Sequence, residues 1–234
     1  MSVIRTLLSF RAPLALLLTT ALLALGGQVA AAVASPVINL SANRVVLPVG
    51  SKSTLTATLS PVQHTGIIEL FEPQTGVWLN SCFPDIVCHL DVTRSAPAVV
   101  QYQAFWTSHD DHNLGTIDIL ASSTVVKVVW GTVSLGSPSA SPVPVGTGVT
   151  LTATTSFDVG PTPDYIKLFD LTTGTLVTGA DGAVVKCPFG TSCTFHVSQP
   201  TAGTHRYAAL VAVFDDRLPP LFDLSSNNQS VQWA

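Results

Sequence analysis

Two pairs of adjacent aspartates are the residues whose type and spacing best suit chemistry. Asp110-Asp111 lies between His109 and His112 ahead of a predicted strand, and Asp215-Asp216 occupies the matching place further along the chain. Carboxylates suit calcium, and the added imidazoles would suit zinc or copper better. The segments lack the ligand spacing of a calcium loop, and aspartate is also common in solvated turns. We therefore expect no metal and no other cofactor, and we keep these four aspartates as the metal candidates.

Signatures of hydrolytic enzymes are missing from the sequence. It contains no Gly-x-Ser-x-Gly elbow and no His-Glu-x-x-His segment. Glycoside cleavage could use carboxylates such as Glu69 and Glu72, but no sequence feature places them around a cleft. We therefore expect no catalytic residues, and an extracellular carbohydrate-active enzyme or an accessory binding module stays as the alternative.

The four cysteines form two pairs with the same spacing. Cys82 and Cys88 enclose five residues, and so do Cys187 and Cys193. Four cysteines allow three disulfide connectivities, and the equal local spacing favours one bridge within each pair. Free thiols or metal ligands are the alternative, but this spacing without a nearby histidine pair suits zinc poorly. The cysteines thus predict two local disulfides and an oxidising compartment.

A repeated segment indicates how the chain is organised. Residues 66–76 resemble residues 164–174, 98 positions further on, and both are alternating segments that end at Thr-Gly. That offset is about the length of one immunoglobulin-like sandwich. No window after residue 34 has a sustained apolar period of 3.6 residues, so we expect an all-β protein. We predict two consecutive immunoglobulin-like β-sandwiches, at residues 35–130 and 131–234, each with about seven short strands.

The first 34 residues have the features of a signal peptide. Arg5 and Arg11 supply a positively charged region, an apolar stretch runs from Ala12 to Leu25, and small residues follow it. We favour cleavage after Ala34, and an uncleaved membrane anchor is the alternative, because the stretch is long enough to span a bilayer. The formal net charge of −4 and the scattered basic residues give no electrostatic footprint for nucleic acid.

One sheet face of each unit is a candidate binding surface. Residues whose strand parity is opposite to that of the predicted core are expected to point outward, and aromatic side chains among polar ones resemble an interface. The alternative is that this face packs against a loop. The candidate residues are Ile67, Phe71, Phe105, Tyr165, Phe169 and Leu210.

The chain resembles secreted bacterial immunoglobulin-like repeat proteins. The resemblance is carried by residues 55–61, by residues 151–154, and by residues 200–204, which lead to Tyr207. These strands carry no cysteine, so the inter-sheet bridge of antibody-type domains is absent. The resemblance implies an exported, non-enzymatic protein in recognition, adhesion or the cell envelope, with an unknown protein or glycan at the cell surface as its partner. A metal-dependent adhesin that uses the aspartate pairs is a further alternative.

Overall fold

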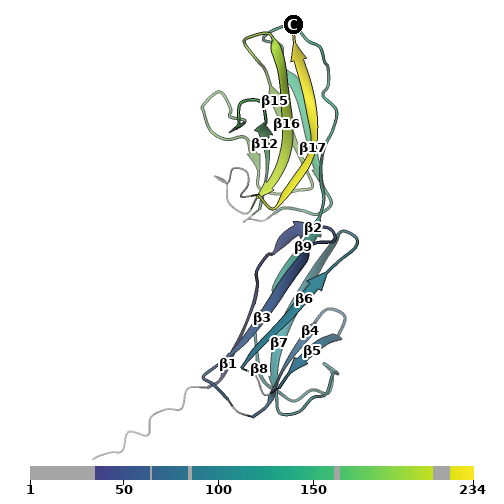
Figure 1. The fold of residues 1–234 in the computed structure, drawn as a ribbon, viewed down its shortest axis with the longest axis vertical. Coiled ribbons are helices and arrows are strands. Elements are labelled where there is room, and N and C mark those ends of the chain that lie inside the picture. Colours follow the sequence, from purple (N-terminus) through teal and green to yellow (C-terminus); the bar gives the residue numbers. More distant parts are fainter. Residues whose placement is uncertain (1–34, 64, 84–85, 161–163, 213–221) are drawn as a thin grey trace, which may run out of the picture. The chain divides into compact units, whose positions relative to one another are not determined.

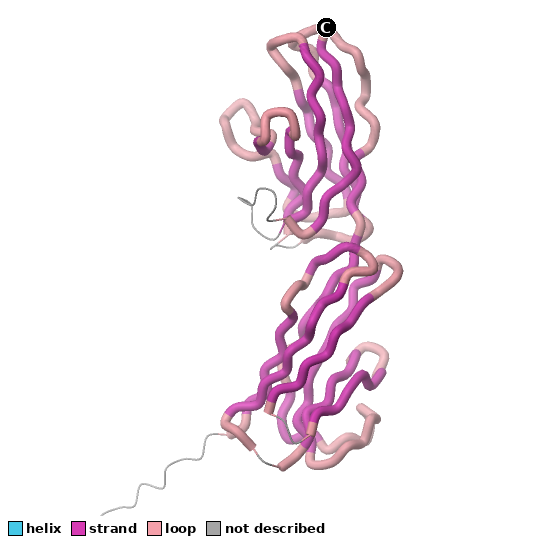
Figure 2. The backbone as a smooth tube through the Cα atoms, viewed as in Figure 1, coloured by secondary structure: helices cyan, strands magenta, loops and turns pink. Residues whose placement is uncertain are grey.

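The computed structural model describes residues 35–63, 65–83, 86–160, 164–212 and 222–234. The predicted signal peptide and Asp215-Asp216 lie outside these ranges. Every regular element in the described ranges is a β-strand (Figure 2), so the all-β prediction is confirmed. In the same ranges, no helix has the length and apolar character needed to cross a bilayer.

Residues 37–131 form two sheets, which we call the first sandwich (Figure 1). One sheet has the order β1-β3-β6, and the other has the order β2-β9-β7-β4-β5, with β8 paired to β7. All pairings are antiparallel except β2 with β9. The strands are β1 (Val37–Ala42), β2 (Val46–Pro48), β3 (Lys52–Ser60), β4 (Ile67–Glu72), β5 (Val77–Cys82), β6 (Val87–Thr93), β7 (Ala98–Thr107), β8 (Ile119–Ser122) and β9 (Val126–Gly131).

Residues 133–233 form two further sheets, which we call the second sandwich. Their orders are β10-β11-β15 and β13-β12-β16-β17, with β14 paired to β12. The order of main strands matches that of the first sandwich and the two-sheet arrangement of immunoglobulin-like folds. The strands are β10 (Val133–Leu135), β11 (Val149–Thr155), β12 (Tyr165–Asp170), β13 (Thr175–Leu176), β14 (Lys186–Cys187), β15 (Ser192–Val197), β16 (Gly203–Ala212) and β17 (Leu224–Trp233).

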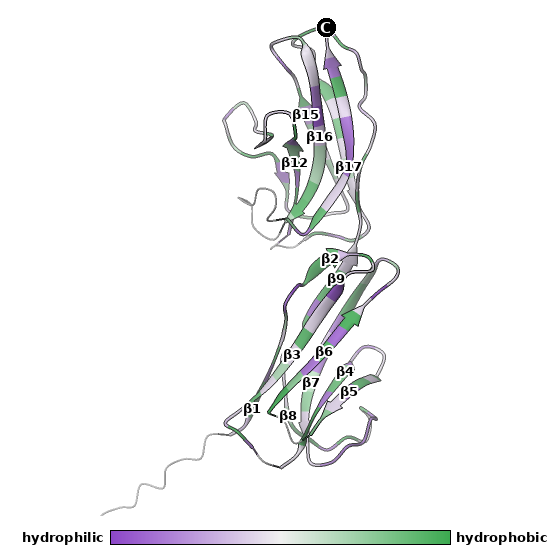
Figure 3. Cartoon of the chain, viewed as in Figure 1, coloured by the Kyte–Doolittle hydropathy of each residue, from purple (hydrophilic) through white to green (hydrophobic). Residues whose placement is uncertain are grey.

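Apolar and polar residues alternate along several of the strands (Figure 3), and this alternation places one face of such a strand in a core. On β3, Leu55, Ala57 and Leu59 are buried, while the threonines between them are partly exposed. Ile68 and Leu70 on β4 are buried as their parity predicts. The independence of the two predicted domains, and their boundary after residue 130, stay predictions.

Each sandwich has a similar corner, at which the end of a strand meets a buried tryptophan. Gly50 has a φ of 81° and donates its amide to the Arg94 carbonyl at 2.8 Å. Gly146 has a φ of 80° and makes the same bond to Gln199. The indoles of Trp130 and Trp233 donate to backbone carbonyls that each follow one of these glycines by one position, Ser51 and Thr147. A left-handed φ favours glycine at both turns. The same glycine turn and tryptophan hydrogen bond therefore occur once in each sandwich.

Candidate binding site

Both predicted disulfides are confirmed. Cys82 is bonded to Cys88 with a Cα–Cα distance of 5.6 Å, and Cys187 to Cys193 with a distance of 5.8 Å. Each bond joins strands of opposite sheets, β5 to β6 and β14 to β15. Local bridges therefore connect the two sheets of each sandwich, although the strands lack the inter-sheet cysteines of antibody domains.

The predicted exposed face of the first sandwich is largely covered, so the prediction is wrong for Phe71 and Phe105. These rings are 0% and 5% exposed, and their centroids lie 5.7 Å apart in an edge-to-face arrangement. They form a small cluster with Ile117 from the connection between β7 and β8. The parity prediction was right, but this connection folds back over the face and excludes water from it. Ile67, at the start of β4, is partly exposed.

The matching face of the second sandwich is also buried at the predicted positions. Phe169 is 8% exposed and Leu210 is 2% exposed, so neither offers a docking surface. Tyr165 is partly exposed, and the Lys186 ammonium lies 4.9 Å from its ring centroid. Strand parity separates the faces of a sheet but does not report what covers each face.

Glu69 shows how the covering segment is held. This carboxylate is fully buried, and its Oε1 accepts hydrogen bonds from the Thr107 hydroxyl and the Asp111 amide, both at 3.2 Å. A buried carboxylate is costly unless it accepts hydrogen bonds, so these donors stabilise Glu69 and fix the segment above it.

The adjacent aspartates Asp110 and Asp111 have separate partners. Asp110 Oδ1 accepts a hydrogen bond from the Ser81 hydroxyl at 2.7 Å, and Asp111 Oδ2 accepts one from the Thr116 hydroxyl at 2.8 Å. Within the described ranges, no group of three or more histidine, cysteine, aspartate or glutamate side chains could hold a metal ion. The hydrogen bonds of these two carboxylates therefore help to fix the conformation of the segment after β7.

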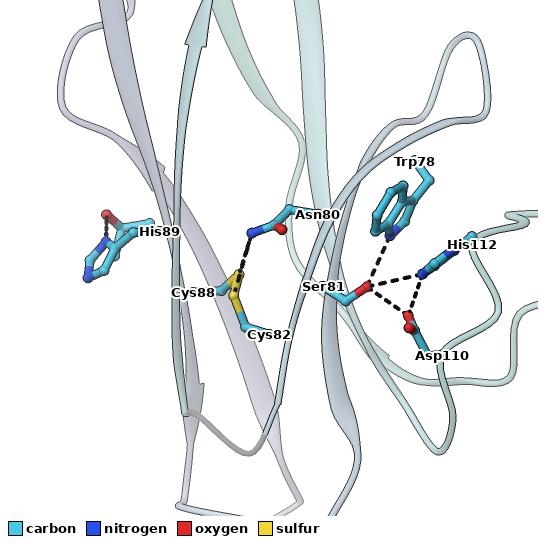
Figure 4. Close-up of a disulfide and its surroundings, with 9 residues drawn as sticks. Trp78, Asn80, Ser81, Cys82, Cys88, His89, Asp110 and His112 are labelled. Carbon is cyan, nitrogen blue, oxygen red and sulfur yellow. Dashed lines mark hydrogen bonds and ion pairs between the residues drawn. A yellow bond between two sulfur atoms is a disulfide. The ribbon is translucent and has the colours of Figure 1, made fainter.

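Ser81, Asp110 and His112 meet beside the first disulfide with the residue types of a catalytic triad (Figure 4). Asp110 Oδ1 and Ser81 Oγ both approach the same ring nitrogen, His112 Nε2, at 2.8 Å and 3.4 Å. A triad instead holds the carboxylate on one imidazole nitrogen and the nucleophile on the other. The Ser81 hydroxyl donates to Asp110 rather than to the imidazole, so this geometry does not activate the serine.

Trp78 completes this cluster. Its indole Nε1 donates to Ser81 Oγ at 3.2 Å, and its ring stacks on His112 with centroids 3.9 Å apart (Figure 4). These contacts attach the segment after β7 to β5. Sequence reasoning missed Trp78 and Ser81, because only the fold brings β5 next to residues about 30 positions away.

The second sandwich contains a cavity of about 470 Å³. Its wall consists of the segment from Thr173 to Ala180, Val185, residues 196–199 at the end of β15, and the buried Asp170 and Tyr207. The strand after β12, β13, has only two residues, whereas β5 at the same place in the first sandwich has six. The chain therefore leaves the sheet edge early in the second sandwich, and the cavity lies where it does so.

A polar network forms the inner end of this cavity. Asp170 Oδ2 lies 2.7 Å from His205 Nδ1, and Asp170 Oδ1 accepts from the Thr172 amide at 2.8 Å. The Gln199 amide nitrogen donates to the Tyr207 hydroxyl at 3.2 Å. Burial raises the pKa of Tyr207. Sequence reasoning overlooked this network, and the available signal was the match between Asp170 and Glu72 in the repeated segment.

Comparison with known proteins finds distant structural likenesses. No protein-family model matches the chain, and no curated protein matches it. Similar solved structures include the human OSCAR ligand-binding domain, with 15% identity, a TM-score of 0.41, and coverage of 83% of this chain and 96% of that one. The D00-D0 domain of intimin has 11% identity, a TM-score of 0.35, and coverage of 84% and 99%. The Yersinia pseudotuberculosis adhesin InvE has 14% identity, a TM-score of 0.29, and coverage of 84% and 58%. Likenesses this distant assign no activity or partner to the chain, and its sandwich assignment rests on the strand order.

Proposed function

We propose that the protein is an exported, non-enzymatic immunoglobulin-like protein that acts in extracellular recognition or adhesion, or as a component of the cell envelope. The observation that carries the proposal is the pair of disulfides, each of which ties together the two sheets of one sandwich. Structural disulfides persist in oxidising compartments and are rare in the cytosol. The bonds thus support an extracytoplasmic location independently of the features of residues 1–34.

Two features favour binding over catalysis. The Ser81 and Asp110 side chains share one nitrogen of His112, which does not provide the proton relay of a hydrolase. The second sandwich offers a cavity of about 470 Å³, which is within the usual size range of ligand sites.

Location is tested by expressing the full chain with a C-terminal epitope tag and fractionating the cells. We expect tagged protein in the envelope or the medium, with an N-terminus at or near Ser35 and no thiol that reacts with maleimide before reduction. A cytoplasmic product with reactive thiols would overturn the proposal.

Recognition is tested by applying the purified exported protein to isolated cell-envelope material. We expect saturable binding that is lost after reduction and alkylation of the disulfides. The companion assay measures release of reducing sugars from the same material by the protein and by the Ser81→Ala and His112→Ala variants. Turnover by the unaltered protein that either substitution abolishes would establish the enzymatic alternative instead.

A further inference from the structure

The cavity of the second sandwich is lined by Asp170 and Gln199, the residues that match the ion pair of Glu72 and Arg94 in the first sandwich. Arg94 forms an ion pair with Glu72, and its guanidinium carbon lies 5.6 Å from the centroid of the Trp130 ring. The matched position in the second sandwich is Gln199, whose shorter side chain is directed to Tyr207. Backbone and tryptophan positions match at this corner. In the second sandwich His205 makes the contacts that Arg94 makes in the first, to the matched carboxylate of Asp170 and to the Trp233 ring, whose centroid lies 5.8 Å from that of His205. The shorter side chain of Gln199 is left to line the cavity.

The charges around the cavity disfavour an ionic ligand. Its described lining contains no lysine or arginine, so an anion finds no permanent counter-charge. Among the described lining residues Asp170 is the one carboxylate, and it already has His205, the Thr172 amide and the Thr173 amide as partners. A cationic ligand would have to displace His205 to pair with Asp170. The chemistry of the wall is therefore best matched by an uncharged ligand.

Apart from the His196 imidazole and the Gln199 amide, the remaining wall is divided between hydroxyl groups and aliphatic groups. Thr175, Thr178 and Ser198 contribute exposed hydroxyl-bearing side chains, which can both donate and accept hydrogen bonds. Val177, Val185 and Val197 contribute apolar surface beside them. A sugar ring has the complementary division, since its hydroxyls project from the ring edge and its C–H groups form apolar faces.

The volume sets the size of the ligand. At about 30 Å³ for each water-sized group, 470 Å³ holds on the order of fifteen such groups. We propose that this cavity binds one sugar unit at the end of an uncharged glycan chain. The inference rests on the proposed recognition function and names the class of ligand for it.

The test is to titrate the purified exported protein with neutral monosaccharides and with neutral disaccharides. Isothermal titration calorimetry measures the affinity, and NMR chemical-shift changes show which residues respond. An acidic sugar and an amino sugar serve as charged comparisons. For one sugar unit in an open site we expect a Kd on the order of 1 mM, with shift changes at residues 173–180 and 196–199. A preference for either charged sugar would overturn the proposal, as would no neutral sugar binding at about tenfold above that concentration.

Gln199→Arg tests the place of binding, because it restores at this corner the residue type found in the first sandwich. We expect binding to weaken at least about tenfold, while the control Gln232→Arg, the same change at an exposed position of β17, leaves Kd within about twofold. Ser198→Leu fills the rim at an exposed residue and provides a second test if Gln199→Arg fails to fold. Unchanged sugar binding in a folded cavity variant would overturn the assignment.

The two proposals fail in different ways. Envelope binding that persists in Gln199→Arg overturns the cavity assignment and leaves the recognition function standing. Absence of envelope binding by the unaltered protein overturns the recognition function. A free disaccharide that binds no better than the monosaccharide supports a site for a single terminal unit, and binding that requires a longer chain contradicts it.

Discussion

In the first sandwich Arg94 crosses the corner to Glu72 and lies over Trp130, whereas in the second sandwich Gln199 stops short and His205 pairs with Asp170. The backbone at the two corners is the same, with a left-handed glycine donating to residue 94 or 199. The residue at the matched position is thus a long side chain in an ion pair in the first sandwich, and a shorter side chain that lines a cavity in the second. Two corners with the same backbone can therefore differ in whether a cavity lies beside them, because a few side chains and the length of one strand differ.

The tyrosines next to the two corners also differ. The Tyr102 hydroxyl is buried and finds no hydrogen-bond partner among the described residues, and burial raises its pKa to about 12. The Tyr207 hydroxyl accepts a hydrogen bond from Gln199. Gln199 therefore provides the hydrogen-bond partner of the Tyr207 hydroxyl and also lines the cavity beside it.

The disulfides give the largest expected effect and test whether the sandwiches are held together alike. Replacing both cysteines of one pair by alanine removes a seven-residue closed loop, so each double variant should lose about 2.4 kcal/mol of unfolding free energy. Hydrogen exchange read by mass spectrometry would localise the loss to strands of the altered sandwich. Equal loss of protection in both sandwiches from one double variant would contradict their separate stabilisation.

Arg94→Gln converts the corner of the first sandwich toward that of the second. The side chains of Arg94 and Glu72 are 32% and 15% exposed, so the pair is only partly desolvated. We expect a loss of about 2 kcal/mol, because Glu72 loses its partner and Trp130 loses the cation. A double-mutant cycle with Glu72→Gln, followed by urea unfolding, measures the coupling. A coupling energy of zero would show that the ion pair does not close the corner.

Asp164 should make stability depend on pH in a way that the first sandwich, with Gly66 at the matched position, lacks. Burial, and then the charge of Asp223, raise the Asp164 pKa to about 6. The folded protein therefore holds a proton between about pH 4 and 6 that the unfolded chain releases, so unfolding free energy falls as pH rises through this window. The loss is complete above the folded pKa.

The substitution Asp164→Asn removes this titration and keeps the shape of the side chain. The variant should nearly match the unaltered protein near pH 4 and exceed its unfolding free energy by about 2 kcal/mol at pH 7.5. Urea unfolding at both pH values checks the difference. A gain that is the same at the two pH values would contradict the assignment to Asp164 ionisation.

Tyrosine-to-phenylalanine changes give the smallest effects, and their signs should differ. Tyr102→Phe removes a buried hydroxyl without a described partner, so we expect no loss of unfolding free energy and a gain of up to about 1 kcal/mol. Tyr207→Phe removes the acceptor for Gln199 and should lose about 1 kcal/mol. Thermal unfolding of the two variants compares them directly. A larger loss from Tyr102→Phe than from Tyr207→Phe would contradict this assignment of a bonded and an unbonded hydroxyl.

Local patterns allowed much of the fold to be predicted. The alternation of Leu55, Ala57 and Leu59 with threonines identified a strand and its buried face, since side chains of a strand alternate with a period of two. Equal cysteine spacing identified both bridges, because a short connection of five residues between two strands can bring the two Cα atoms within disulfide reach.

The candidate site was much less accessible to sequence reasoning. Phe71 and Phe105 were placed on the correct face, but the segment that covers them is distant in sequence from Phe71 and has no periodic pattern. The cavity was not foreseen, because its existence depends on where β13 ends and on how far the side chain of residue 199 extends.

The sequence by itself determined the strands, their buried faces and the two disulfides, because each follows from neighbours a few residues apart. Only the tertiary structure decided which outer faces are covered, that Ser81, Asp110 and His112 meet in a geometry that does not activate the serine, and that one corner borders a cavity. These outcomes depend on side-chain reach and on contacts between distant segments. A linear pattern of residue types does not contain that information.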